Sequence, residues 1–288
     1  MSKDPAPRTP FEWVLLATPG LIWGASFLFI AFGLESLAPN GVTFVRLLIG
    51  FVTLSVFPAA RGSVRREDHL GIFWVGVLWM AFPLSMFPFA EQHISSAMTG
   101  MLNGANPLFV VIVAAFLART MPRRSVILGL VVGMTGAVMI AWPGLGEGSH
   151  SILGIGLVMA ALVSYGVALN LARPLQQRNG GLPVIWRALG VALILTAPLG
   201  VPALKHAHWT LRSALCMLAL GSLGTAAAQV LMVRAAGKFG ASTASASTFL
   251  IPVVALGLGV VVRGEHVAPI SVLGGAVCLA GAWLISRK

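Results

Sequence analysis

Apolar runs of about 18–25 residues recur from one end of the chain to the other, and each is long enough to cross a hydrocarbon core of ~30 Å. Only 9% of the 288 residues are charged, whereas a water-soluble domain carries about 25%. A chain with so few charges cannot cover a folded surface of this size in water. The runs are also too continuous for the alternating strands of a β-barrel. The sequence therefore predicts an all-α integral membrane protein.

The runs predict ten transmembrane helices joined by short connections. Their expected ranges are 13–33, 40–60, 70–90, 95–118, 125–142, 151–172, 183–203, 211–233, 240–262 and 267–286. With the N-terminus in the cytoplasm, ten crossings return the C-terminus there. This places 14 of the 19 Lys and Arg residues on the cytoplasmic side and only Lys205, Arg212 and Arg263 outside, as the positive-inside rule expects. The net charge of +11 then reflects contact with anionic lipid, and no nucleic-acid partner is expected.

The two halves of the chain resemble each other. A shift of 145 residues aligns prolines and glycines, the residues that set backbone shape, without a gap: Pro107 with Pro252, Gly129 with Gly274, and Gly136 with Gly281. Earlier in the halves, a shift near 142 aligns Trp23-Gly24 with Tyr165-Gly166 and brings Arg46 within one residue of Arg187. Because each half holds five helices, the second half must enter the membrane from the opposite side. We therefore expect an inverted 5+5 repeat, with units at residues 1–145 and 146–288.

Small residues spaced four apart occur in the fifth and tenth expected helices. They are Gly129 and Gly133 in one, and Gly274 and Cys278 in the other. Such pairs let two helix backbones approach closely. We expect these two helices to pack as a scaffold outside the transport pathway.

Several stretches resemble the EamA-type exporters of the drug/metabolite transporter superfamily. TFVRLLIG (43–50) is similar to the family's arginine-bearing second helix. The stretches at 94–117 and 239–265 resemble its paired fourth and ninth helices, each with small residues before a mid-helix proline. Gly264-Glu265 fits the family's Gly-Glu ending, whereas Arg119-Thr120-Met121 replaces that glutamate in the first half.

The resemblance covers essentially the whole chain, and within the family it is strongest to the YddG-type exporters. It implies a secondary transporter of the bacterial inner membrane that exports aromatic and other neutral amino acids by alternating access.

A neutral polar patch is expected in the middle of the membrane. Thr99, Asn103 and Asn106 lie three or four residues apart and so share one helix face. Ser245 and Thr248 lie at or beside the equivalent places of the ninth helix. An asparagine side chain offers donors and an acceptor, so it can bind the carboxylate and ammonium of a zwitterion. The architectural residues of these two helices are expected to be the prolines that each remove one backbone donor, Pro107 and Pro252.

Four further helices are expected to surround this patch with aromatic, thioether and polar side chains: Trp23 and Phe27; Trp79, Met80, Phe82 and Met86; Ser164, Tyr165 and Asn170; Thr225 and Gln229. Such walls suit large apolar side chains. The aromatic residues could equally face lipid or core, and the asparagines could instead form interhelical hydrogen bonds. Arg46 and Arg187 lie within their helices, where each either captures a substrate carboxylate or ties the helix to backbone carbonyls.

Acidic residues decide the expected mechanism. All eight Asp and Glu residues are predicted to lie outside the membrane centre, whereas a small proton-exchanging antiporter needs a buried carboxylate. We therefore expect facilitated transport without ion coupling, and no metal or cofactor. Motifs such as Gly-x-Ser-x-Gly and His-Glu-x-x-His do not occur, so an enzyme is not expected. Other readings stay open: a drug or other metabolite exporter on the same fold, with or without proton coupling, a non-transporting scaffold, and either a monomer or a homodimer.

Overall fold

Every regular element in the described part of the chain, residues 9–119, 121–146 and 148–286 of this computed structural model, is helical. The α-helices are α1 (Pro10–Leu34), α2 (Pro39–Ser55), α3 (His69–Val75), α4 (Phe82–Ala90), α5 (Ser96–Asn103), α6 (Asn106–Ala118), α7 (Arg124–Gly146), α8 (Ser149–Asn179), α9 (Gly181–Ala203), α10 (Leu211–Ala219), α11 (Ala228–Phe239), α12 (Ala241–Ser245), α13 (Leu250–Arg263) and α14 (Pro269–Ser286). Two π-helical segments are η3 (Gly76–Ala81) and η5 (Leu220–Ala227). Four 3-10 segments are η1 (Pro58–Arg61), η2 (Arg66–Asp68), η4 (Leu204–His206) and η6 (Ala246–Phe249).

The predicted all-helical membrane fold is confirmed. Eight helical segments of the described chain are long and apolar enough to cross a membrane, and Pro39–Ser55 and Pro269–Ile285 are shorter apolar helices. These ten segments correspond to the ten predicted ones. That all ten cross the bilayer, with both termini in the cytoplasm, stays a prediction.

The predicted helices at 70–90 and 211–233 each contain a π-helical segment. A shift of Gly76 by the 145 residues of the repeat gives residue 221, inside η5. Each segment packs tightly against a helix of the other half. A Cβ on Gly76 would lie 2.9 Å from the Ala188 carbonyl oxygen of α9, and a Cβ on Gly221 would lie 3.0 Å from that of Arg46 in α2. The backbone of the repeat is therefore duplicated in detail at these two places.

The predicted helix at 95–118 is interrupted between α5 and α6. The amides of Gly104 and Ala105 donate to carbonyls only three residues back. Pro107, which follows the break, has no N–H to donate to the Asn103 carbonyl. In the second half, α12 passes through η6 into α13, whose third residue is Pro252. The paired prolines therefore follow paired interruptions.

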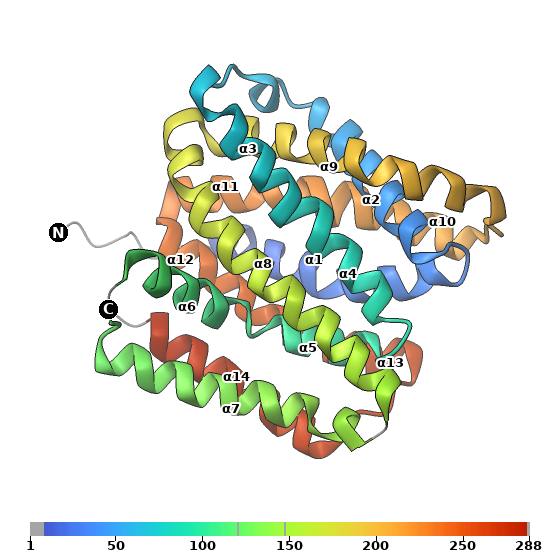
Figure 1. Cartoon of the computed structure of the whole chain (residues 1–288), viewed down its shortest axis with the longest axis vertical. Coiled ribbons are helices and arrows are strands. Elements are labelled where there is room, and N and C mark those ends of the chain that lie inside the picture. Colours follow the sequence, from blue (N-terminus) through green and yellow to red (C-terminus); the bar gives the residue numbers. More distant parts are fainter. Residues whose placement is uncertain (1–8, 120, 147, 287–288) are drawn as a thin grey trace.

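Helices α7 and α14 lie side by side along one edge of the bundle (Figure 1). Glycine makes this close approach possible: a Cβ on Gly136 would lie 2.3 Å from the Cys278 amide nitrogen. Likewise, a Cβ on Gly281 would lie 2.4 Å from the Gly133 Cα. The predicted close packing of the fifth and tenth helices is confirmed.

Candidate functional site

A cavity of about 350 Å³ lies inside the bundle and is lined from both halves of the chain. This volume is in the range of small-molecule sites, roughly 300–1,000 Å³. Twelve of the predicted site residues line it together: Trp23, Phe27, Arg46, Trp79, Met80, Asn103, Asn106, Tyr165, Thr225, Gln229, Ser245 and Thr248. The fold thus brings most of the predicted set to one place. Their role in binding stays a prediction.

Three predicted polar residues are not among those that line the cavity, and each bonds to backbone. Thr99 donates from Oγ1 to the Ser95 carbonyl at 3.0 Å within its own helix. Ser164 donates to the Leu78 carbonyl at 2.7 Å. Asn170 donates to the carbonyls of Val110 and Gly166 at 3.0 and 2.8 Å. These hydrogen bonds join helices or cap carbonyls. Interhelical hydrogen bonding was the alternative to substrate binding that the sequence left open for the asparagines.

Arg187 also lies apart from the cavity, and the reason is its register. Gly76 packs against the Ala188 carbonyl, and its repeat mate Gly221 packs against the Arg46 carbonyl. The repeat counterpart of Arg46 is therefore Ala188, and Arg187 lies one residue before it. One residue on an α-helix rotates a side chain by about 100°. Arg187 accordingly donates to the Pro183 carbonyl at 3.2 Å and lies over the Trp186 ring. This geometry fits a structural hydrogen bond to a backbone carbonyl, and not the capture of a substrate carboxylate.

The π-helical segments form two walls of the cavity. Trp79 and Met80 come from η3, and Gly224 and Thr225, which are 145 residues further on, come from η5. A side chain from the other half caps a carbonyl on each segment. Trp23 donates from Nε1 to the Gly224 carbonyl at 3.0 Å, and Ser164 caps η3 at Leu78 in the corresponding manner. Such π segments are frequent at functional sites.

The π segment η3 also explains an error in the predicted lining. Phe82 and Met86 were expected beside Trp79, as regular helical spacing indicates, but Leu84 and Phe87 line the cavity instead. A π turn holds an extra residue, which rotates the residues after it. Phe82 is 40% exposed on the outside of the bundle. No pattern in this sequence distinguishes a π turn from an α turn.

Hydrogen-bonding capacity remains unused inside the cavity. The side-chain oxygens of Asn103 and Asn106 are buried, and neither accepts a hydrogen bond within the described chain. Arg46 is buried, and its Nε donates to Thr225 Oγ1 at 2.9 Å. An unpaired buried polar atom costs about 1–3 kcal/mol. The two amide oxygens therefore keep their capacity to accept hydrogen bonds within the cavity.

The cavity reaches one end of the molecule. It is lined there by Gln176 near the end of α8, Ala236 near the end of α11 and the exposed Ser245 at the end of α12. The start of α1 lies at the same end, because Glu12 forms an ion pair with Lys238 at 2.9 Å.

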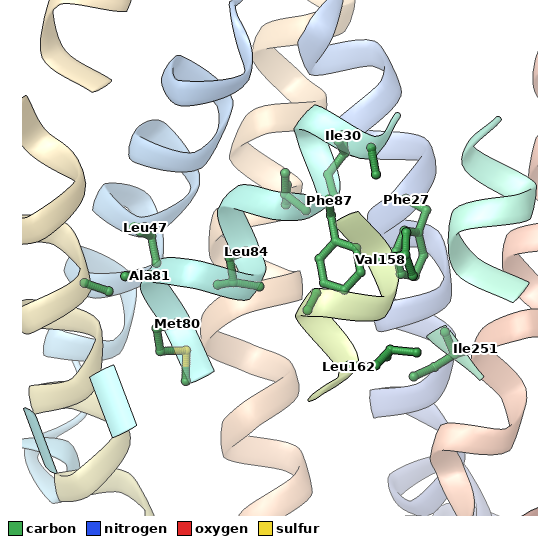
Figure 2. Packing of buried hydrophobic residues seen from close by; sticks show 14 of the residues in the cluster. Phe27, Ile30, Leu47, Met80, Ala81, Leu84, Phe87, Val158, Leu162 and Ile251 are labelled. Atoms are coloured by element: carbon green, nitrogen blue, oxygen red, sulfur yellow. The ribbon is translucent and has the colours of Figure 1, made fainter. Parts of the chain in front are cut away.

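Aromatic rings close the cavity toward the opposite end. The Phe27 and Phe87 rings pack edge to face with centroids 5.5 Å apart, and Phe87 lies 5.9 Å from Tyr165. Figure 2 shows Phe27 and Phe87 side by side below Ile30. We call Phe27, Ile30 and Phe87 the plug.

A second cavity of about 220 Å³ lies beyond the plug, lined in part by Glu35, Glu91, Arg263 and Glu265. The sequence placed these acidic residues at the outer helix ends but did not predict a cavity there. The helical spacing of Phe87 and Glu91, four residues apart, was the one signal that they share a face.

The chain is similar to several proteins that are named as transporters or exporters. A protein of Streptantibioticus cattleyicolor named "Probable terminal-alkyne amino-acid exporter" is 29% identical over 280 residues, which cover 96% of this chain and 93% of that protein. An "Uncharacterized transporter" of Archaeoglobus fulgidus is 23% identical over 277 residues, covering 96% and 99%. A solved crystal structure shares the fold with a TM-score of 0.67 at 18% identity, covering 96% of each chain.

A model of the EamA-like transporter family matches this chain twice, at residues 11–142 and 152–287. The two matches fall on the two halves of the predicted repeat, while the boundary at residue 145 stays a prediction. The family consists of transporters and not enzymes, and the apolar helices make this chain a multi-pass membrane protein. The protein belongs to the EamA-like transporter family.

Proposed function

We propose that the protein is a secondary transporter that exports aromatic and other neutral amino acids from the bacterial cytoplasm by alternating access. The observation that carries this proposal is the unused polar capacity of the cavity. The carbonyl oxygens of Asn103 and Asn106 can accept hydrogen bonds from a substrate ammonium. The guanidinium of Arg46 lines the same cavity and can pair with a substrate carboxylate.

The walls of the cavity support an apolar side chain on the substrate. Trp23, Phe27, Trp79 and Tyr165 provide aromatic surface, and Met80 adds a thioether that adapts to varied shapes. The name of the Streptantibioticus cattleyicolor relative also points to an amino-acid substrate. Together these features favour neutral amino acids with large side chains over other metabolites.

We further propose that transport follows the substrate gradient without obligatory ion coupling. Among the described residues that line the cavity there is no Asp or Glu. A carboxylate that exchanged a proton for substrate would need to lie where both can reach it. Efflux measured at a fixed substrate gradient should therefore carry no protons in fixed ratio when a pH gradient is imposed. A constant proton-to-substrate ratio would refute this part of the proposal.

The test of the substrate uses proteoliposomes preloaded with labelled phenylalanine. The unmodified chain should release label faster than empty liposomes do. Asn103→Ala should raise the apparent KM about 3- to 10-fold, since one hydrogen bond contributes a net free energy of about 0.5–1.5 kcal/mol. The matched control is Gln177→Ala, which removes an exposed amide of α8 away from the cavity. Its KM should equal that of the parent chain.

The remaining alternatives give different results in the same assay. A drug exporter would release a hydrophobic cation, and phenylalanine would not compete with that release. A non-transporting scaffold would assemble normally and release neither compound. Absence of protein-dependent efflux for every amino acid tried would refute the proposed substrate class.

A further inference from the structure

A network of charged groups joins both halves of the chain at the end of the molecule beyond the plug. Glu265 accepts hydrogen bonds from the amides of Ser96 and Ala97 at 3.1 and 2.8 Å, and from Ser96 Oγ at 2.7 Å. These amides belong to the first turn of α5, where a carboxylate is stabilised by the free N–H groups. We call this contact the clamp. It must part if this end is to open.

Two arginines complete the network. Arg263 lies 3.2 Å from Glu265 and 3.5 Å from Glu35, and Arg212 also pairs with Glu35. Glu35 and Glu265 therefore both have positively charged partners. Glu91, the third acidic residue of this cavity, has none within hydrogen-bonding distance.

Glu91 is a buried carboxyl without a hydrogen bond. It follows α4 one turn after the plug residue Phe87, and its amide donates to the Phe87 carbonyl at 2.9 Å. Both carboxyl oxygens are shielded from solvent, and neither has a partner. An unpaired ionised carboxylate in such a place is expensive, and the group neutralises instead. The arrangement fits a carboxylic acid and not a carboxylate.

The charged groups that face Glu91 come from several elements. Burial raises the pKa of the Glu91 carboxyl well above its usual range, and the negative charge of Glu265 raises it further. The positive charges of Arg263 on α13 and Arg46 on α2 oppose this rise. Glu35 lines the same cavity from the end of α1. His93, two residues further along the chain, carries an imidazole and is therefore replaced in a control below.

We propose that Glu91 is a proton-binding site that controls opening of the clamp, and that it is protonated when this end is shut. This inference rests on the proposed alternating-access function, because only a transporter that opens at this end needs such control. Loss of the proton would add a negative charge beside Glu265 and Arg263. Arg263, which already pairs with Glu265 and Glu35, would then be shared among three carboxylates, and the clamp would weaken.

The direction of the pH effect follows from linkage. Opening wets Glu91 and returns its pKa toward the ordinary value of a glutamic acid, so the shut state holds the proton more tightly than the open state. The proton therefore favours the shut state, and this preference is lost as the pH rises through the raised pKa. The plug separates Glu91 from the substrate cavity, so the proton enters and leaves on one side. The site regulates opening and requires no proton transport.

The experiment measures opening directly and needs no substrate. In a chain with Cys216→Ala and Cys278→Ala, a cysteine replaces Ala31, which lies beside the plug in the second cavity. Its labelling by a membrane-impermeant thiol reagent is divided by that of Lys205→Cys. Lys205 is exposed at the same end, where the His208 amide donates to the Ser36 carbonyl. The ratio removes the pH dependence of thiol chemistry itself.

The ratio should rise with pH, by about tenfold for each pH unit that separates the ordinary pKa of a glutamic acid from the raised pKa of Glu91 in the shut state. In Glu91→Gln, which keeps the shape of the protonated acid, the ratio should stay low and constant. Glu91→Asp and His93→Gln should keep the response. A constant ratio in the parent chain, or an unchanged response in Glu91→Gln, would overturn the proposal.

A second measurement covers the case in which Glu91→Gln does not fold. Infrared difference spectra of the unmodified chain should contain a carbonyl stretch of a protonated carboxyl that disappears over the pH range in which the labelling ratio rises. Absence of such a band at the acidic end would also overturn the proposal. Failure of amino-acid efflux, with an intact labelling response, would count against the substrate class and leave the proton site standing.

Discussion

Arg46 brings a positive charge into a cavity whose other described lining residues are neutral. It reaches this position because Gly221 and Gly50 let α2 pack tightly against η5, whose Thr225 then accepts a hydrogen bond from Nε. A structural arginine and a substrate-binding arginine would both be buried here. They differ in whether the remaining N–H groups of the guanidinium are used by substrate.

We predict that Arg46→Lys raises the apparent KM for phenylalanine efflux about 10- to 100-fold, because a lysine keeps the charge but loses the planar fork that pairs with a carboxylate. The sharper measurement is competition by phenylalaninamide, which lacks the carboxylate. The parent chain should prefer phenylalanine strongly, and Arg46→Gln should lose that preference. An Arg46→Gln chain that folds and still discriminates between the two compounds would assign Arg46 a purely structural role.

The two interrupted helices, which carry Pro107 and Pro252, cross each other at their interruptions. A Cβ on Gly104 would lie 2.6 Å from Pro252 Cγ and 3.0 Å from the Met101 carbonyl oxygen. A proline ring and a backbone carbonyl cannot move aside as a flexible side chain can. The two paired interruptions are thus held in direct contact, between the first half and the second.

Gly104→Ala should therefore destabilise the protein by about 1–3 kcal/mol, the usual cost of overpacking, and lower the Tm in detergent by roughly 5 °C. The matched control is Gly257→Ala on α13, where an added Cβ would meet nothing within 4 Å. That change should leave the Tm the same or raise it slightly, since alanine is the better helix former. Equal Tm values for the two variants would contradict the proposed contact.

The sequence allowed the paired prolines to be predicted but not the π segments, for physical reasons. Pro107 and Pro252 could be aligned because proline constrains the backbone wherever it occurs, so the repeat was visible without a structure. The π segments η3 and η5 could not be predicted, because a π turn uses the same residue types as an α turn. That omission placed Phe82 in the cavity in place of Phe87. Glu91 lines the second cavity together with Arg263 and Glu265, which lie about 170 residues further along the chain, and no local pattern predicts that arrangement.

For the whole molecule, the two cavities and the plug between them correspond, under the proposed function, to one state of an alternating-access cycle. The larger cavity reaches the end with Glu12 and Lys238, and the clamp joins the two halves of the chain at the other end. In the predicted orientation the open end faces the cytoplasm, which is the side from which an exporter takes its substrate. The orientation and the open end can be tested together.

Ser245 is exposed where the larger cavity reaches the end of the bundle. In the chain without native cysteines, an impermeant maleimide should label Ser245→Cys in inverted membrane vesicles and at least about tenfold less in intact cells, because a bilayer excludes charged reagents. Lys205→Cys should show the opposite preference. Labelling of both positions from one side would refute the ten-helix topology, and a reversed preference would refute the orientation.

The same cysteine reports whether the cavity holds substrate. Saturating phenylalanine should slow labelling of Ser245→Cys in inverted vesicles, since the ligand occupies the cavity that this residue lines. Gly237→Cys is the matched control, because residue 237 is exposed at the same end and a Cβ there meets nothing within 4 Å. Its labelling should not respond to phenylalanine. Equal protection at both positions would mean that phenylalanine changes the conformation of this end instead of entering the cavity beside Ser245.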